Sequence, residues 1–418
     1  MNILRLNAYF EPEITAASHL MNDLYEGFSK NKIKCSIITP EPTRGISEEI
    51  RKKYKKRRNE NLLNGYLEVK RFSMIREGKN PIQRALRYLM CSVAHYYKGI
   101  HQKNVDVIFS GSTPPTNGMI SILVARKLSK KYKKKVRFIY ELQDIFPDSL
   151  VNAKLTHEGS LIWKIGRKIE QFTYFYADNI IVPTIEMKKN LLQKNVDPEK
   201  ISVISNWIDC SKVKPIKKED NFLYDELGIS KDNFIVLYAG NLGEAQGADI
   251  VIKVADALKE YKNIKFVIFG GGVYFQEIKS QAEKKRNIIV RNLLPVEYVS
   301  FVYSLGDVAL ITCKKGTGKA AMPSKTWSIM ACNTPIIASF DTESELSNIM
   351  DKSGAGECIE PENDEKLKKT ILKYYELKKK PSYKNSSYGR DYVEKYASKE
   401  VCVEKYIEIV MNRSKRED

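Results

Sequence analysis

The feature that most constrains the fold is a repeated alternation of short apolar runs with longer amphipathic segments. Residues 2–9, 33–39 and 105–111 have the length and apolar content of buried strands, and segments with the apolar spacing of helices separate them. A chain that alternates strand and helix in this way builds parallel sheets covered by helices. The sequence therefore predicts an α/β fold.

The alternation stops at a polar, lysine-rich stretch at 212–225 and restarts with an apolar run at 234–239. A chain of 418 residues also exceeds the size of one typical core, so a second domain is expected. We predict two Rossmann-like domains that face each other across a cleft, an N-terminal one at 1–211 and a C-terminal one at 212–387. Residues 388–418 are predicted to form a helix that crosses back to the N-terminal domain.

Positive charge is concentrated in the first half of the chain. Residues 1–200 hold 36 Lys and Arg against 20 Asp and Glu, whereas residues 201–418 hold 34 against 31, for a formal net charge of +19. Such an asymmetry predicts a polyanionic partner for the first half, either nucleic acid or an acidic membrane face. A generally lysine-rich composition is the simpler alternative, but the second half argues against it as the whole cause.

Two segments of this half suggest a membrane surface. Residues 51–58 contain seven basic side chains in eight, and residues 81–103 predict a helix with one apolar face flanked by cations. The apolar face holds Leu86, Leu89, Met90, Val93, Tyr96 and Tyr97, and the flanking cations are Arg84, Arg87 and Lys98. Such a helix can lie in the interface of an anionic bilayer. Equally, it can pack this face on the sheet.

Other global features place the protein in the cytoplasm. The seven cysteines are scattered and form no CxxC pair, which predicts neither a disulfide framework nor a zinc site. The N-terminus has too short an apolar run for a signal peptide, and no segment has the length of a membrane span. We predict a cytoplasmic protein that binds peripherally to the inner face of the cell membrane.

The stretch 310–339 predicts an anion site. A strand runs into a loop with Lys314, Lys315 and Gly316, and Pro323, Ser324 and Lys325 precede a helix. The lysines bring positive charge, the amide groups at the helix start attract anions, and Ser324 is a candidate N-cap. A nucleotide diphosphate fits such a site, and the alternative is an ordinary basic surface loop.

Three glycine-rich turns, at 240–247, 270–272 and 316–318, each follow a predicted strand of the second half. Glycine lets the backbone approach a ligand closely. Together with the lysines they predict a nucleotide-sugar pocket. Its candidate residues are Gly240, Asn241, Gly243, Gln246, Gly271, Gly272, Lys314, Lys315, Gly316, Pro323, Ser324 and Lys325.

In the first half, Gln143 and Asp144 come directly after the predicted strand at 136–141, where open parallel sheets bind ligands. Asp144 is alternatively the N-cap of the following turn. The chain has no DxD pair and only four histidines, so we predict neither a metal nor a cofactor. Lysines and helix dipoles would neutralise a leaving diphosphate instead.

The segments FEPE, LQDIFPD, ISNWID, YAGNLGEAQGADIVIKVA and MPSKTWSIMACNTPIIAS occur in this order over nearly the whole chain. In this order they resemble bacterial glycosyltransferase family 4, most closely the branch of fucosyl and N-acetylfucosaminyl transferases of capsule, O-antigen and slime clusters. The resemblance implies a GT-B fold, a nucleotide-sugar donor in the C-terminal domain, an acceptor in the N-terminal domain and a retained anomeric configuration.

The same resemblance assigns residues. Gly240, Asn241, Gly243 and Gln246 would line the diphosphate turn, and Gln143 and Asp144, the catalytic candidates, would stand near the anomeric carbon. The acceptor loop would be Thr15, Ala16, Ala17 and Ser18. The paired glutamates of the wider family fall on Ala320 and Ser328, so we expect Lys314, Lys315 and Lys325 to supply the charge that binds the diphosphate.

The function predicted in this way is transfer of an N-acetylated or 6-deoxy hexose from a nucleotide diphosphate to a lipid-linked saccharide, with UDP as the preferred nucleotide. An epimerase of GT-B fold is an alternative, although this chain is poor in the histidines that such an enzyme would use. A nucleic-acid-binding protein would explain the charge, but it would leave the glycine turns without a role.

Overall fold

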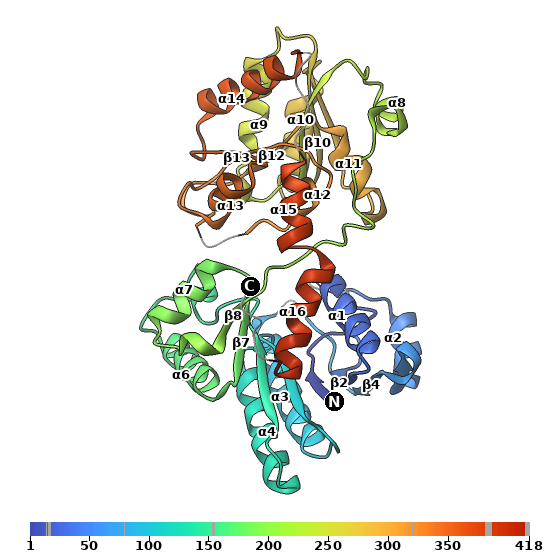
Figure 1. Ribbon diagram of the computed structural model, residues 1–418, viewed down its shortest axis with the longest axis vertical. Helices are drawn as coiled ribbons and strands as arrows, with labels where there is room; N and C mark the ends of the chain where they lie inside the picture. Colours follow the sequence, from blue (N-terminus) through green and yellow to red (C-terminus); the bar gives the residue numbers. More distant parts are fainter. Residues whose placement is uncertain are drawn as a thin grey trace. The chain divides into compact units, whose positions relative to one another are not determined.

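The computed structural model describes residues 1–13, 15, 18–78, 80–152, 155–319, 322–380 and 387–413 of the chain. It divides into two compact units, each built on one sheet covered by helices (Figure 1). Unit 1 is Met1–Ser205 together with the chain from Val403 onward, and unit 2 is Asn206–Cys402. The predicted α/β fold with two domains and parallel sheets is confirmed, and the first boundary follows Ser205 whereas the sequence placed it after residue 211.

The sheet of unit 1 has the strand order β3-β4-β2-β1-β5-β6-β7-β8. Neighbouring strands are parallel except for β3, which runs antiparallel to β4. The strands are β1 Asn2–Leu6, β2 Lys34–Pro40, β3 Asn59–Leu62, β4 Leu67–Phe72, β5 Val107–Gly111, β6 Arg137–Glu141, β7 Asn179–Val182 and β8 Ile201–Val203. The order reverses between β1 and β5, so the loops after these two strands open at the crevice where such sheets bind ligands.

Helices cover both faces of this sheet. They are α1 Ser18–Lys30, α2 Glu48–Lys56, α3 Pro81–Gly99, α4 Asn117–Tyr132, α5 Asp148–Asn152, α6 Leu161–Tyr176 and α7 Ile185–Gln193. Strand residues such as Leu4, Ile108 and Phe138 belong to one core with buried residues of α3 and α4. Alternate residues point to the other face, where Phe109 contacts Tyr406 of the C-terminal helix α16 (Lys399–Met411).

The sheet of unit 2 has the order β11-β10-β9-β12-β13-β14, and its neighbouring strands are parallel. The strands are β9 Phe234–Asn241, β10 Ile264–Gly271, β11 Ile288–Asn292, β12 Val308–Thr312, β13 Ile336–Ser339 and β14 Gly356–Ile359. This is the order of a dinucleotide-binding fold, with its reversal between β9 and β12. The turns after β9 and β12, both selected from the sequence, therefore lie at that crevice.

The helices of unit 2 also form two layers. They are α8 Leu223–Leu227, α9 Asp249–Ala257, α10 Phe275–Glu283, α11 Val299–Leu305, α12 Lys325–Ala331, α13 Glu345–Ser353, α14 Asp364–Lys378 and α15 Tyr388–Tyr396. Helices α9, α10 and α14 share one core with Val236 and Ile268, while α11, α12, α13 and α15 share the other with Leu237 and Ile311.

The predicted single C-terminal helix is two helices, α15 and α16, with a break at Ala397 and Ser398. The backbone at the break pairs with Ile208, whose amide donates to the Ala397 carbonyl (3.1 Å) and whose carbonyl accepts from Lys399 (2.9 Å). These bonds replace the helical hydrogen bonds there. The expectation that the tail returns to the first domain is confirmed for α16, since the chain from Val403 onward belongs to unit 1.

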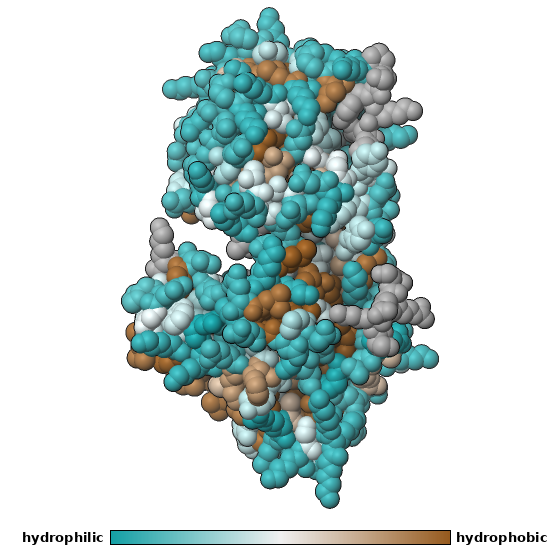
Figure 2. Space-filling view, turned by 60° about the vertical axis from the view of Figure 1, so that its left-hand side comes forward, coloured by the Kyte–Doolittle hydropathy of each residue, from teal (hydrophilic) through white to brown (hydrophobic). Residues whose placement is uncertain are grey.

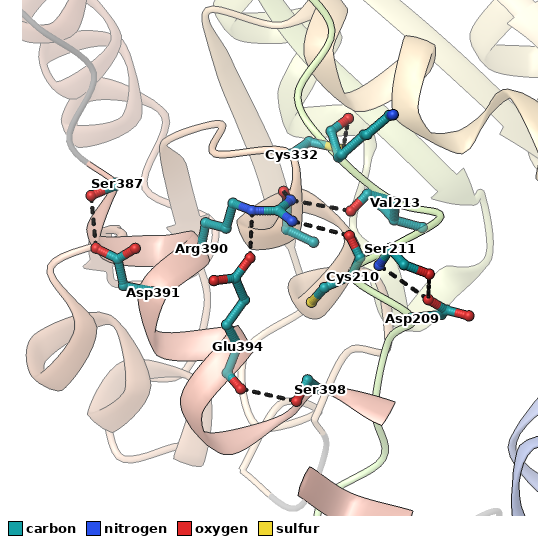
Figure 3. A network of polar contacts seen from close by, with 12 residues as sticks. Asp209, Cys210, Ser211, Val213, Cys332, Ser387, Arg390, Asp391, Glu394 and Ser398 are labelled. Carbon is teal, nitrogen blue, oxygen red and sulfur yellow. Dashed lines mark hydrogen bonds and ion pairs between the residues drawn. The ribbon is translucent and has the colours of Figure 1, made fainter. Parts of the chain in front are cut away.

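Arg390 of α15 ties the first segment of unit 2 to its core (Figure 3). Its guanidinium donates to the carbonyl oxygens of Cys210 (3.0 Å), Val213 (3.2 Å) and Ala331 (2.6 Å), and its Nε pairs with Glu394 at 2.7 Å. Three carbonyl acceptors and one carboxylate thus saturate most of the donors of this side chain. The arginine fixes the path of residues 210–213.

Candidate active site

The last residues of β9, which lead into the turn, include a backbone conformation that favours glycine. Gly240 has φ of 151°, and a Cβ atom added there would lie 3.3 Å from the Nζ of Lys325. Gln246 closes the turn, because its Oε1 accepts from the Nδ2 of Asn241 and from the amide of Gly243, both at 3.1 Å. The spacing of asparagine, glycine and glutamine in this motif is therefore the spacing of a self-closed turn.

The turn after β10 packs directly on the turn after β9. A Cβ at Gly270 would overlap the Leu242 side chain, and one at Gly272 (φ 126°) would lie 2.5 Å from the Oδ1 of Asn241. The amide of Leu242 also donates to the Gly271 carbonyl at 2.7 Å. The structure thus brings together two of the three predicted glycine turns, and glycine is required where they touch.

The third turn, after β12, is also joined to the first. The Lys314 amide donates to the Ala245 carbonyl (2.9 Å), and Thr312 Oγ1 donates to the Gln246 carbonyl (2.6 Å). Gly247, with φ of 55°, leaves room for this approach, because its Cβ would lie 3.3 Å from the Lys314 amide nitrogen. All three turns therefore form one assembly at the carboxyl edge of β10, β9 and β12.

Lys314 does not carry the unpaired charge that the sequence predicts. Its Nζ lies 3.2 Å from Asp249 and 3.2 Å from Glu362, and hydrogen bonds to these two carboxylates raise the pKa of Lys314. Lys315 has an exposed side chain, and its amide donates to Glu362 at 3.0 Å. The two acids thus balance much of the positive charge predicted for this loop.

Asp341, which sequence reasoning missed, holds the glycines of the same loop. Its carboxylate accepts from the amides of Gly316 (2.9 Å) and Gly318 (2.8 Å), and it is 6% exposed. A signal was present in the sequence, because Asp341 follows the apolar run of β13 as Asp144 follows that of β6. These two amides are therefore occupied by a protein carboxylate.

The expected capping at α12 is wrong. Ser324 has helical backbone angles and makes no side-chain cap hydrogen bond, while the Thr326 amide donates to the Pro323 carbonyl at 3.0 Å. Ser324 itself is exposed, and Pro323 is half-buried. Ala320 lies outside the described residues. The start of α12 is therefore stabilised by a backbone turn, and its serine remains available to solvent.

Lys325 is the lysine that the structure places against the glycine turn. Its Nζ lies 4.1 Å from the ring centroid of Tyr238 on β9, and burial lowers its pKa to about 7. The Tyr238 hydroxyl in turn donates to the Asn241 carbonyl at 2.7 Å. Within the described part of the chain, no hydrogen bond or ion pair joins the Lys325 amine to a carboxylate. A diphosphate on this turn would give the amine a counter-charge.

In unit 1, the two predicted catalytic residues lie at the end of β6 with different surroundings. Gln143 is half-buried and its Nε2 donates to Glu141 at 3.4 Å, whereas the Asp144 side chain is exposed. Glu141 is buried, pairs with Arg5 at 3.1 Å and accepts from Tyr406 at 3.3 Å. This buried ion pair, which the sequence did not reveal, holds the carboxylate to which Gln143 donates.

The predicted acceptor loop is described only in part. Thr15 and Ser18 bond each other, since the Thr15 amide donates to the Ser18 hydroxyl at 2.8 Å and the two hydroxyls are 3.0 Å apart. Ala16 and Ala17 lie outside the described residues. Glu13 of the FEPE motif accepts from the amides of Thr43 and Arg44, each at 2.7 Å. The motif thus fastens the loop to the segment after β2.

No group of three or more His, Cys, Asp or Glu side chains is arranged to hold a metal ion among the residues that the structure describes. In the same part of the chain, no helix has the length and apolar content needed to cross a bilayer.

Both halves of the chain match known protein families. Residues 17–212 match Glycosyltransferase Family 4, and residues 220–390 match Glycosyl transferases group 1. The chain carries both domains of a glycosyltransferase. These two domain matches confirm the resemblance to glycosyltransferase family 4 that the sequence motifs indicated.

Curated relatives of these domains come from bacteria. The "Probable glycosyltransferase WbjE" of Pseudomonas aeruginosa is 27% identical over 274 residues, which are 65% of this chain and 66% of that protein. WcaI of Escherichia coli K12, named as a colanic acid biosynthesis glycosyl transferase, is 25% identical over 276 residues, or 65% of this chain and 67% of that protein. The chain therefore aligns with about two thirds of the length of these relatives.

Solved structures of other proteins share the fold. Anabaena HepE in complex with UDP superposes with a TM-score of 0.69 at 14% identity, over 99% of this chain and all of that one. Sucrose-phosphate synthase from Thermosynechococcus elongatus gives 0.68 at 13% identity, over 98% of each chain. The predicted GT-B class is thus confirmed.

Proposed function

We propose that this protein is a retaining glycosyltransferase of cell-surface polysaccharide synthesis. It would move an N-acetylated or 6-deoxy hexose from a UDP donor to a lipid-linked saccharide, as fucosyl and N-acetylfucosaminyl transferases do. The bacterial relatives, one of them named for colanic acid biosynthesis, and the UDP complex of HepE support this proposal. The observation that carries it is the three glycine turns joined at the switch point of the second sheet, with the Lys325 amine against them.

The turns after β9 and β10 would offer the donor diphosphate close backbone approach, and Lys325 would offer it charge. In the reaction, the bond from the anomeric carbon to the diphosphate oxygen breaks while a bond to the acceptor hydroxyl oxygen forms on the same face. A diphosphate oxygen takes the hydroxyl proton, so no protein nucleophile is needed. The enzyme contributes position and stabilisation of the departing negative charge, without a metal ion.

The acceptor side would lie in unit 1, near Gln143 and the loop of Thr15 and Ser18. A lipid-linked acceptor requires the enzyme at the inner face of the membrane, and the basic excess of residues 1–200 supports that location. Asp144 has an exposed carboxylate, which suits contact with the sugar or the acceptor better than proton transfer.

The proposal is tested by nucleotide release. The purified protein, treated with EDTA, is incubated with UDP-, GDP- and dTDP-linked sugars and a lipid-linked saccharide fraction, and the free nucleotide is measured. We expect release of UDP from a UDP-linked N-acetylated or 6-deoxy hexose, and a higher melting temperature with UDP than with GDP or dTDP. Release that stops when metal is removed would overturn metal independence, and a preference for GDP or dTDP would overturn the choice of donor.

A further inference from the structure

Helix α3 buries charged and polar side chains and exposes apolar ones, the opposite of an ordinary surface helix. Its inner face carries two large polar side chains beside the small Cys91: Arg87 and His95 are fully buried, and they bond the carbonyl oxygens of Ala8 (3.2 Å) and Asn7 (3.2 Å) just after β1. Ser92 bonds Thr116 at the start of α4 at 2.7 Å. An ordinary helix on a sheet buries its apolar side chains and exposes its polar ones.

The apolar face of α3 points away from the sheet as a result. Leu89 is 62% exposed, Val93 62% and Tyr97 66%, and they recur at intervals of four residues along one side of the helix. Ile82, Leu86, Met90 and Tyr96 are exposed too. Figure 2 shows brown, hydrophobic side chains on the surface of unit 1, in the bottom half of the picture. Contiguous exposed apolar area of this kind marks an interaction site.

This face borders an apolar groove. The groove has a volume of about 510 Å³, and α3 contributes Leu89, Met90, Val93 and Tyr97 to it. Phe72 and Met74, at and just after the end of β4, form the opposite wall, and Lys98 lies among the lining residues. The groove thus has the chemistry of a hydrocarbon site with a cation at its edge.

The basic helix α2 is fixed to the same wall. Arg51 donates to the Met74 carbonyl at 3.0 Å, and Arg58, just beyond α2, donates to Ser73 Oγ at 3.3 Å. The four lysines of α2 are exposed: Lys52, Lys53, Lys55 and Lys56. Within the described residues, none of these lysines forms an ion pair with a carboxylate. Residues 72–74 therefore connect an apolar surface to a cluster of unpaired cations.

We infer that the apolar face of α3 and the lysines of α2 form one docking surface for an anionic phospholipid bilayer. The inference rests on the proposed function only in that a lipid-linked acceptor requires such a surface. The apolar side chains enter the acyl region, and the lysines meet the phosphate headgroups. A second copy of this chain is a poorer occupant, because a two-fold contact would bring two sets of unpaired lysines together.

The test is flotation of the full-length protein with vesicles of phosphatidylcholine alone and of phosphatidylcholine mixed with phosphatidylglycerol. Val93→Glu is compared with Val296→Glu, which places the same charge change on an 82% exposed valine of unit 2. We expect Val93→Glu to reduce partitioning to the anionic vesicles roughly tenfold or more, and Val296→Glu to leave it unchanged. Equal partitioning of both variants would overturn the inference.

The charge component is tested by replacing Lys52, Lys53, Lys55 and Lys56 with Gln. A matched control replaces four exposed lysines of unit 2 with Gln: Lys259, Lys262, Lys279 and Lys284. We expect the α2 variant to lose roughly a hundredfold in partitioning at low salt and most of its preference for phosphatidylglycerol, whereas the control keeps both. Wild-type protein that binds both vesicle types equally would contradict the inference.

Two further readouts separate the outcomes. If wild-type protein sediments as a dimer that Val93→Glu dissociates, and vesicle partitioning is unchanged, the face is a contact between copies and the bilayer inference is wrong. The UDP-induced rise in melting temperature is measured on the same variants. Lost vesicle binding with an intact UDP response supports docking by this surface, and absence of a UDP response in wild-type protein would remove the proposed donor without affecting the docking result.

Discussion

The amine of Lys325 lies 4.1 Å from the ring centroid of Tyr238, at the base of the glycine turn after β9. An ammonium over an aromatic face gains electrostatic stabilisation, but burial works against the charge and lowers the pKa of Lys325 to about 7. The charge on this lysine is therefore set by what occupies the turn.

We predict that Lys325→Met lowers turnover or donor affinity by roughly one to three orders of magnitude, because a preorganised cation is lost. In wild-type protein, UDP affinity should also fall as the pH rises above about 7, where the free enzyme loses the charge on Lys325. Calorimetric titration with UDP across this range measures the affinity of both proteins and its dependence on pH, and the nucleotide-release assay measures turnover. An identical pH dependence in Lys325→Met would assign it to the phosphates of UDP.

The same lysine makes a prediction about stability. Its pKa is about 7 in the folded chain and about 10.4 when unfolded, so between these values the unfolded chain binds the extra proton. The free energy of unfolding therefore rises with pH across this interval, and below about pH 7 the full cost of charging the buried amine is present. Chemical denaturation should show that Lys325→Met reduces this slope.

Gly240→Ala tests the contact between the turn and the lysine. The substitution forces alanine into φ of 151° and places its methyl group 3.3 Å from the Lys325 amine. We expect a loss of about 1–3 kcal/mol in the free energy of unfolding, together with weaker UDP binding. Gly228→Ala is the control, because Gly228 has φ of 64° with no atom within 4 Å of the added Cβ. Equal UDP affinity in the two variants would contradict a role of this contact in UDP binding.

Asp341→Asn should loosen the loop after β12. One carboxylate oxygen accepts from each of the Gly316 and Gly318 amides, and an asparagine would present a donor to one of them. We expect the free energy of unfolding to fall by about 1.5–3 kcal/mol. Thermal unfolding of Asp341→Asn beside Asp225→Asn, an exposed aspartate of the same unit, makes the comparison. Matching midpoints would contradict a structural role for Asp341.

Arg390→Ala should destabilise unit 2 by about 2–4 kcal/mol, because three carbonyl groups and Glu394 lose one shared donor. Arg390→Lys should recover only part of this loss, since a single ammonium cannot reach all of these acceptors. Arg286→Ala removes an exposed arginine from the same unit and serves as the control. Unfolding by denaturant distinguishes the three variants, and full recovery by lysine would rule out the multidentate role.

The strands that the sequence predicted are those buried on both faces, because continuous apolar runs identify them without knowledge of their neighbours. The polar edge strand β3, with the sequence NENL, has no such signal and is defined by its pairing with β4. The glycine turns were also predicted, since glycine and the strand ends fix them locally. The packing of these turns on one another could not be predicted without knowing the order of the strands in the sheet.

What the sequence could not provide are partners distant along the chain. Lys314 meets Asp249 and Glu362, so its predicted free charge is balanced by residues from other elements. The helical wheel identified the apolar face of α3 correctly. It could not say which face lies on the sheet, because Arg87 and His95 are buried only through carbonyl groups at the end of β1.

Unit 1 is not continuous in sequence, because its face around Phe109 and Glu141 is completed by Tyr406 from α16. During synthesis, the first 205 residues leave the ribosome long before that helix is made. Until α16 is made, Glu141 lacks the hydrogen bond from Tyr406. The face of unit 1 around Phe109 and Glu141 is therefore completed only after nearly all of unit 2 has been made, and a truncation before α16 would leave this face uncovered.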